Sequence, residues 1–351
     1  MLSIRDGLTV PAISVVIPIT RYEKELEDAI SSVFEQSFQD FEIVLVDNSA
    51  TEGTRTVAEK WQRNHPDRIR IVSEPRKGAA SARNKGIQEG LGEFIALLDS
   101  DDMMKPDRLK IQLNMMCERD DISLLGSWKD EVSSDGKTLL SRDVKPETPR
   151  WARLLFARRP RFRQDPLAEP QTSTFFFRKS TAIEIGMFDT RFDPFWLEDS
   201  DFVLRMYEAG KVLIVPQSLI FYRTHSKDDA EKRIFDFRLI ENHALFFRLL
   251  KDRYGDSEND DLKRSLRKLE SRWLRESGIK LLYFQSGEKL GSILLKRALE
   301  QDFLDLRNWK AFVLSRLSRP FYPKPFGVSP RVLYKLPDGI DDSWAQNVFD
   351  R

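Results

Sequence analysis

Short β-branched runs alternate with segments of helical periodicity through the first hundred residues. The apolar runs that predict strands lie at 13–18, 41–47, 69–72 and 93–98. Apolar residues at helical spacing between Leu26 and Phe34 predict the first helix, and 57–62 and 79–89 predict two more. This repeated order of strand, helix and strand predicts an α/β fold with an open, mostly parallel sheet and helices on both faces.

Acidic residues follow two of the predicted strands. The strand at 41–47 ends on Asp47, and the strand at 93–98 is followed by Asp99, Asp101 and Asp102. Clustered carboxylates repel one another and are costly to desolvate, so they indicate a hard divalent metal, commonly one that carries substrate phosphates. The alternative is an acidic cap for the helix predicted at 106–115. Because ligands bind outside the carboxyl ends of the strands in such sheets, we expect a site at this edge.

Composition narrows the class of protein. The 351 residues can form one large and one small domain. The 57 Lys and Arg residues balance 56 Asp and Glu residues, and a net charge of +1 argues against a nucleic-acid partner. Cys117 is the single cysteine, which excludes an internal disulfide and fits a reducing compartment. The sequence shows no apolar run of membrane-spanning length, so we expect neither a signal peptide nor a membrane span, and a cytoplasmic location.

Seven short segments occur together in an order that resembles a known family. They are 14–18, 42–49, 82–86, 97–106, 186–189, 198–201 and 222–225. In order and approximate spacing they are similar to the motifs of family 2 glycosyltransferases, inverting enzymes of the GT-A fold. The resemblance covers about residues 11–226. It implies a catalytic domain at 1–230, with a nucleotide-sugar-binding half at 1–105 and an acceptor-side half at 106–230.

The resemblance implies a nucleotide-sugar donor, with a UDP-sugar as the expected one, and assigns four donor-binding residues. Pro18 closes the first strand, and Asp47 accepts a hydrogen bond from the nucleotide base. Asp99 holds the ribose or the sugar, and Arg83 lies near the phosphates. A turn cap is the alternative for Asp47, and a surface charge is the alternative for Arg83. Departures from the family pattern at 19–22 and 47–50 alter the edges of the predicted base pocket.

The resemblance also implies a metal and a catalytic base. Asp101 and His225 are the implied ligands or contacts of Mn²⁺ or Mg²⁺ at the donor diphosphate. The Glu198–Asp199 pair is the implied catalytic pair, and Asp199 is the residue that takes the proton of the acceptor hydroxyl. Asp201 in the same segment is expected to be a helix cap.

Two aromatic residues precede this acidic pair. Phe195 and Trp196 would form a flat apolar wall on the acceptor side, or would raise the basicity of the carboxylate by desolvation.

The remaining residues fall outside the resemblance. The pattern predicts a helical C-terminal region at 231–351, and between Leu306 and Leu336 it holds seven cations, six aromatic residues and no acid. Such a basic-aromatic tail suits an anionic membrane surface, as does the acid-free stretch 150–163. For both, the alternative is a helix that packs its apolar face on a core and leaves arginines in solvent.

The sequence therefore predicts a metal-dependent inverting glycosyltransferase. Its acceptor would be a hydroxyl of a glycan or glycolipid in cell-surface polysaccharide or lipopolysaccharide assembly, at the inner face of the membrane. A polyprenyl-phosphate sugar transferase is the alternative enzyme. A nucleotide-binding interaction protein on a degenerate GT-A fold is the alternative outside enzymology.

Overall fold

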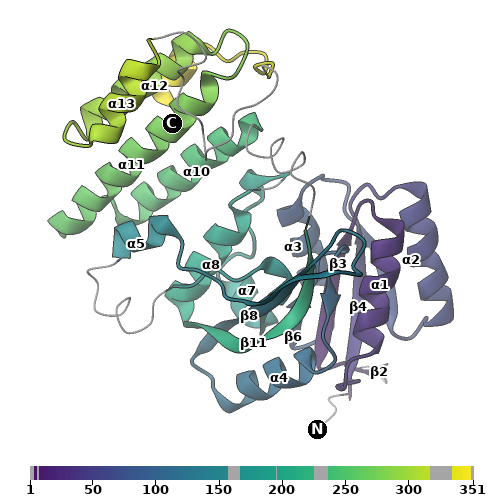
Figure 1. The fold of residues 1–351 in the computed structure, drawn as a ribbon. Helices are drawn as coiled ribbons and strands as arrows, with labels where there is room; N and C mark the ends of the chain where they lie inside the picture. The colour runs from purple at the N-terminus through teal and green to yellow at the C-terminus, as the bar shows by residue number, and fades with distance from the viewer. Residues whose placement is uncertain are drawn as a thin grey trace. The chain divides into compact units, whose positions relative to one another are not determined.

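The computed structural model describes residues 4–5, 8–156, 167–194, 196–224, 236–316 and 334–348. The chain forms two compact units (Figure 1). The first, the sheet unit, contains Met1–Pro149 and Asp165–His225. The second, the helical unit, contains Arg150–Gln164 and Ser226–Arg351.

The sheet unit is built on one mixed sheet. The order of its described strands is β5-β4-β3-β6-β10-β8-β11-β7, with β9 beside β8. Their bounds are β3 Ile13–Ile19, β4 Phe41–Asp47, β5 Ile69–Ser73, β6 Phe94–Leu97, β7 Met103–Met104, β8 Ile122–Val132, β9 Leu139–Val144, β10 Phe176–Arg178 and β11 Lys211–Arg223. A separate pair joins β1 Ile4–Arg5 and β2 Leu8–Thr9.

The two halves of this sheet differ in strand direction. β5, β4, β3 and β6 are parallel, which brings the carboxyl ends of β3, β4 and β6 to one edge. β10 pairs antiparallel with both β6 and β8, and β8 pairs parallel with β11. The predicted α/β fold is confirmed, and the antiparallel strands that complete the sheet are a feature that the sequence pattern did not reveal.

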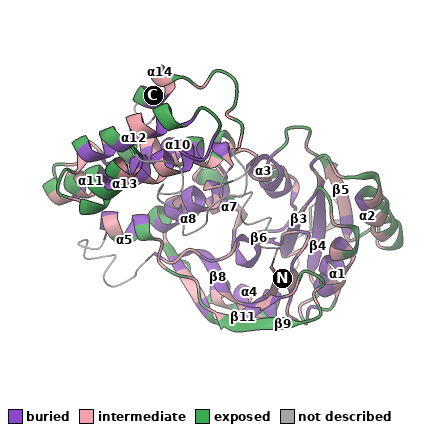
Figure 2. Cartoon of the chain, turned by 45° about the horizontal axis from the view of Figure 1, so that its top comes forward, coloured by how far each residue is buried: buried purple, intermediate pink, exposed green. Residues whose placement is uncertain are grey.

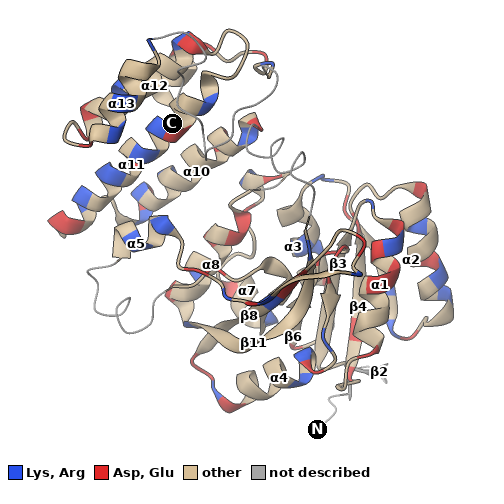
Figure 3. Ribbon diagram, in the orientation of Figure 1, with Lys and Arg blue, Asp and Glu red and all other residues tan. Residues whose placement is uncertain are grey.

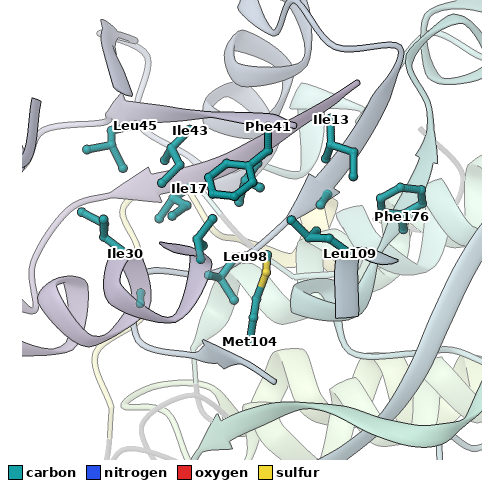
Figure 4. Close-up of a cluster of buried hydrophobic side chains, with 14 of the residues drawn as sticks. Ile13, Ile17, Ile30, Phe41, Ile43, Leu45, Leu98, Met104, Leu109 and Phe176 are labelled. Carbon is teal, nitrogen blue, oxygen red and sulfur yellow. The ribbon is translucent and has the colours of Figure 1, made fainter. Parts of the chain in front are cut away.

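Helices cover the sheet where their apolar residues recur at helical spacing. The bounds are α1 Glu23–Phe34, α2 Glu52–Asn64, α3 Ala79–Glu89, α4 Arg108–Glu118, α7 Lys179–Glu184 and α8 Glu198–Ala209, with short 3-10 turns η1 Thr172–Thr174 and η2 Thr190–Phe192. The core joins both strand directions and α1, as Ile17, Ile30, Phe41 and Phe176 show (Figure 4). This core fixes the strand ends from which the candidate site is built.

The helical unit combines α5 with five described helices that follow it much later in the sequence. Its bounds are α5 Arg150–Phe156, α10 Phe237–Tyr254, α11 Asp260–Leu281, α12 Glu288–Gln301, α13 Leu306–Leu314 and α14 Asp342–Asn347. Trp151 of α5 packs edge-on against Phe246, and Phe156 packs edge-on against Tyr254. The apolar face of α5 is therefore buried in the helical unit, whereas the family resemblance grouped 150–164 with the residues of 106–230.

The predicted helical C-terminal region is confirmed by α10 to α14. Of the segments predicted to contact a membrane, 157–163 and 317–333 lie outside the described residues. In the part of the chain that the structure describes, no helix combines the length and the apolar composition needed to span a membrane.

Candidate functional site

The ends of β3 and β4 lie side by side, and both carry predicted donor-side residues. Pro18 of β3 stands in register with Val46 of β4, and Asp47 is the last residue of β4. The Asp47 carboxylate accepts hydrogen bonds from the backbone N–H of Ala50 and from Nε of Arg55, each at 2.8 Å. Burial acts to raise the pKa of Asp47, but these bonds outweigh it and lower the pKa below its usual value. Asp47 thus caps the turn that follows it.

Asn48 stands where the family resemblance leads one to expect a second acid. Its buried side-chain amide donates to the carbonyls of Glu74 and Arg76, and its Oδ1 accepts from the N–H of Gly78 at 2.9 Å. Gly78 has φ +150°, and a Cβ there would meet the Asp193 side chain. Asn48 therefore fixes the loop that leads into α3.

Arg83 of α3 joins two acids from distant parts of the sequence. Its guanidinium is buried and donates to Glu198 Oε1 at 2.8 Å and to Asp99 Oδ1 at 3.1 Å. Burial alone would lower the pKa of Arg83, but Asp99 and Glu198 together raise it above its ordinary value. Arg83 is therefore a charged member of the site, and the alternative of a surface charge is excluded by its burial.

The carboxylates that follow β6 are held in different environments. Asp102 is buried, accepts from the Ser173 hydroxyl at 2.5 Å and accepts from the backbone N–H of Arg223 at 3.0 Å. Burial first, and then Asp101 and Asp99, raise the pKa of Asp102 well above its usual value. The Asp99 side chain is 30% exposed. Asp102 is thus bound into the structure, whereas Asp99 opens toward solvent.

Hard oxygen donors gather where the metal was predicted. Asp101 is partly exposed in the turn between Asp99 and Asp102. The described residues contain no group of three side chains placed to hold a metal ion. Mg²⁺ in phosphate sites takes one or two carboxylates together with substrate phosphates, so the oxygen donors of this turn fit such an ion. His225, the other predicted metal contact, lies outside the described residues.

The start of α8 presents the second acidic group. Trp196 and Leu197 precede it with φ of 87° and 68°, a backbone conformation that non-glycine residues rarely adopt and that often occurs at functional sites. Burial and repulsion from Asp199 raise the pKa of Glu198 to about 7. Burial also raises the pKa of Asp199, against the opposing effect of Arg83. Phe195 lies outside the described residues, and Trp196 is half-buried.

Two further acids lie beside the Glu198–Asp199 pair: Asp201 and Glu169. Asp201 forms an ion pair with Arg205 one turn along α8, so it does not cap the helix. Glu169 was not anticipated, because no motif surrounds it; the Ser200 hydroxyl donates to its carboxylate. Burial and then repulsion from Asp199 raise the pKa of Glu169 to about 8. Glu169 therefore adds a further acid, from outside the helix, to the three in the first turn of α8.

Asp193 was also missed, and its carboxylate binds the start of α3. Its carboxylate accepts from the N–H groups of Ala80 and Ser81 and from the Ser81 hydroxyl. The two N–H groups belong to the first turn of α3 and have no partner within the helix, so Asp193 caps α3 from more than 110 residues away. Asn84, one residue after Arg83, exchanges hydrogen bonds of 2.8 Å with the backbone of Phe188. The segment from Phe188 to Asp193 is thus bound to α3 at both ends.

Sequence comparisons identify relatives for this arrangement. Residues 14–186 match the model of the family described as glycosyl transferase family 2. The chain is 39% identical over 110 residues to the putative teichuronic acid biosynthesis glycosyltransferase TuaG of Bacillus subtilis, which covers 31% of this chain and 43% of that protein. It is 27% identical over 238 residues to an uncharacterized glycosyltransferase of Methanocaldococcus jannaschii, covering 67% of this chain and 78% of that protein. The match therefore spans less than half of TuaG.

Solved structures share the fold. The crystal structure of S. aureus TarS residues 1–349 in complex with UDP aligns with a TM-score of 0.55 and 18% identity, over 88% of this chain and 85% of that one. The mannosyltransferase PcManGT of Pyrobaculum calidifontis, in complex with GDP-Man and Mn²⁺, aligns with a TM-score of 0.53 and 17% identity, over 89% and 82%. At such identities the likeness concerns the fold.

Proposed function

Because residues 14–186 form a glycosyltransferase family 2 domain, and the chain has the GT-A fold, we propose that this protein is an inverting, metal-dependent sugar transferase. The donor is a nucleoside-diphosphate sugar, with a UDP-sugar as the first candidate. The acceptor is a hydroxyl of a glycan or glycolipid. The reaction contributes to cell-surface polysaccharide or lipopolysaccharide assembly at the cytoplasmic face of the membrane.

One observation carries the proposal: Arg83 binds Asp99 and Glu198 at once. Asp99 follows a strand of the parallel half of the sheet, where a nucleotide binds in such folds, and Glu198 starts α8. The buried guanidinium therefore holds a donor-side carboxylate next to the Glu198–Asp199 pair. A transferase needs this proximity, because donor and acceptor must be fixed within reacting distance of each other.

On the donor side, the strand ends supply the binding groups. Asp47 accepts from the base and Pro18 lines the same strand end, while Asp99 accepts from sugar or ribose hydroxyls. The lowered pKa of Asp47 keeps it ionised, as an acceptor of an imide N–H must be. Arg83 brings positive charge toward the donor sugar and the phosphates.

Asp199 is the proposed general base. Glu198 is buried and already pairs with Arg83, and Asp201 pairs with Arg205, so each has a structural partner. Asp199 is partly exposed, and its raised pKa improves its ability to accept a proton near neutral pH. It takes the proton of the acceptor hydroxyl as that oxygen attacks the anomeric carbon on the face opposite the diphosphate. Trp196, with Phe195, would provide the apolar wall for the acceptor.

The ligands and names of the related proteins support the choice of donor, ion and process. TarS was solved with UDP and PcManGT with GDP-Man and Mn²⁺, and TuaG is named for teichuronic acid biosynthesis. Mn²⁺ or Mg²⁺, bound by Asp101 and His225, would neutralise charge on the diphosphate leaving group. Asp99 and Asp101 lie two positions apart, so the donor sugar and the diphosphate would be bound by neighbouring parts of one loop.

A binding experiment tests this proposal directly. UDP, GDP and their sugars are screened for thermal stabilisation with and without Mn²⁺, and isothermal titration then measures the affinity of the best nucleotide. Asp101→Ala should remove the Mn²⁺ dependence while the fold stays intact; Asp107→Ala, an exposed acid a few residues later, is the matched control. If no nucleotide or nucleotide sugar stabilises the protein, with or without Mn²⁺, the transferase proposal fails. Unchanged Mn²⁺-dependent binding in Asp101→Ala would remove only that residue from the site.

A further inference from the structure

Exposed apolar side chains are concentrated in one short part of the helical unit. Of the nine large hydrophobic residues that are exposed in the described part of the chain, five lie between Phe303 and Val313. We call them the apolar stripe: Phe303, Leu304, Leu306, Trp309 and Val313. Leu304 is 88% exposed and Leu306 is 80% exposed. A cluster of this kind on a folded surface marks an interaction site more often than single exposed residues do.

The stripe follows one side of α13 and the loop before it. Leu306, Trp309 and Val313 recur at helical spacing, so they share a face. Asn308 and Ala311 are buried on the opposite face against the unit's core. The outward side of α13 thus carries a line of apolar side chains, where a helix that packs on a core with one face ordinarily keeps polar residues. Figure 2 shows the exposed positions around this part of the helical unit.

The loop that presents Phe303 and Leu304 has a defined conformation. Trp309 Nε1 donates to the carbonyl of Phe303 at 3.0 Å, and the two rings pack edge to face at 5.0 Å. Asn308 Nδ2 donates to the carbonyl of Asp302 at 2.9 Å. The exposed side chains therefore project from a fixed loop.

Cations border the stripe. Arg307, Lys310 and Arg316 are exposed on or just after α13 (Figure 3). Arg150 of α5 lies close enough to Arg272 and Arg307 that their positive charges, with burial, lower its pKa. Two acids nearby have partners: Asp305 pairs with Arg275 and Arg307, and Glu276 pairs with Arg272. In the sequence, the seven cations between Leu306 and Leu336 are not accompanied by any acid.

We propose that the apolar stripe inserts into the interface of an anionic membrane while the bordering cations contact lipid phosphates. Phe and Leu side chains favour the boundary between headgroups and acyl chains, and a tryptophan favours the same depth. Lys and Arg near an anionic leaflet add an attraction that salt weakens. The arrangement matches that of interfacial helices, which lie in the plane of the membrane.

A second copy of this chain is a weaker candidate for the occupant. A stable protein interface buries about 800 Å² on each partner, and five side chains along one narrow stripe cover only part of such an area. Self-association would also bring the bordering cations of two copies together. Membrane binding requires no sugar transfer, so this inference can fail while the proposed function stands, and the reverse also holds.

Vesicle flotation with the full chain tests the inference. Vesicles of phosphatidylcholine alone are compared with vesicles that contain phosphatidylglycerol, at low and high salt. Leu304→Ser with Leu306→Ser should weaken binding to the anionic vesicles about tenfold or more. Leu139→Ser with Leu140→Ser, a pair exposed on β9 of the sheet unit, is the matched control and should bind like wild type. Both pairs are exposed, so both variants should fold.

A charge variant separates the two parts of the attraction. Lys310→Gln with Arg316→Gln should weaken binding and reduce its salt dependence, whereas Lys60→Gln with Arg63→Gln on α2 should leave both unchanged. The inference is overturned if wild type floats with neither vesicle, or if the stripe variant and its control bind alike. Light scattering that shows a wild-type dimer, lost in the stripe variant, would instead assign the stripe to self-association and overturn the membrane proposal.

Discussion

Each unit of this chain contains an arginine that is only 6% exposed, Arg83 in the sheet unit and Arg275 in the helical unit. The two residues are alike in their first contacts. Arg83 donates to Asp99 and Glu198, and Arg275 donates to Asp305 and Asn308. They differ in what surrounds those partners, and this difference separates a candidate reaction site from a structural network.

The network around Arg275 is closed. Asn308 Nδ2 donates to the Ser271 hydroxyl and to the carbonyls of Ala298 and Asp302. Asp305 also accepts from Arg307, whose hydrogen bond is the main reason that the pKa of Asp305 falls to about 2. These partners all lie within the helical unit, so the network holds α11, α12 and α13 together.

The network around Arg83 is open. Asp99 is partly exposed, and Glu198 Oε2 has no hydrogen-bond partner within the described residues. The acids beside it, Glu198, Asp199 and Glu169, all have raised pKa values, the opposite of Asp305. An incompletely satisfied, partly exposed polar network costs stability and is retained where a substrate completes it.

The largest effect expected from this comparison is on turnover. Asp199→Asn keeps the size of the side chain but cannot accept the acceptor's proton, so kcat should fall by about 10²–10⁴ with donor affinity nearly unchanged. Steady-state kinetics and donor titration measure the two quantities. Glu208→Gln, at the exposed end of the same helix, is the control and should keep wild-type turnover. Near-normal activity in Asp199→Asn would move the base to Glu198 or Glu169.

The next effect is on the stability of the sheet unit. Arg83→Met leaves the carboxylates of Asp99 and Glu198 without their cation, and removing one partner of a buried ion pair costs about 3–5 kcal/mol. Arg55→Met removes the partner of Asp47, but the Arg55 side chain is 46% exposed, so this change should cost much less. Urea unfolding compares the two variants. An equal loss in the free energy of unfolding would mean that the burial of Arg83 does not make its ion pairs more important for stability.

A smaller loss of stability is expected in the closed network. Asn308→Ala leaves the Ala298 and Asp302 carbonyls without this donor, at a cost of about 1–3 kcal/mol, and should not change kcat in the folded protein. Hydrogen exchange should show the loss of protection in α11 to α13 and not in α3. Asn347→Ala, whose amide donates at an exposed position of α14, is the control. A fall in kcat would contradict a purely structural role for Asn308.

The sequence predicted the strands and helices of the parallel half because the spacing of apolar residues within each element is enough to identify it. The strand Phe41–Asp47 and the helix Ala79–Glu89 appear with the predicted bounds. The sequence grouped α5 with 106–230, whereas it packs in the helical unit, because an amphipathic pattern shows that a face is buried but does not say in which core.

Contacts between distant residues left no comparable signal. The Ser173 hydroxyl binds Asp102 across 71 positions, and Asp193 caps α3 across 113. Glu169, Ser173 and Asp193 belong to no short motif, so only the folded chain brings them to the site. The order of the family-like segments did indicate that Asp99, Arg83 and Glu198 belong together. The roles assigned to those residues, and to Phe195 and His225, stay predictions.

The smallest expected effect is the change of stability with pH, which should have opposite signs in the two networks. Glu169 has a pKa near 8 in the folded state and an ordinary value of 4.5, so between these values the folded state binds more protons than the unfolded state, and stability falls as pH rises. Asp305 has a folded pKa near 2 and an ordinary value of 3.8, so its contribution is complete above pH 3.8 and is lost as pH falls toward 2. Either slope is at most about 1.4 kcal/mol for each pH unit.

Urea midpoints measured across both pH windows should show a flatter alkaline slope in Glu169→Gln and a flatter acid slope in Asp305→Asn. If each substitution leaves its own slope at the wild-type value, charge does not distinguish the open network from the closed one, and only the difference in exposure between Asp99 and Asp305 would still separate them.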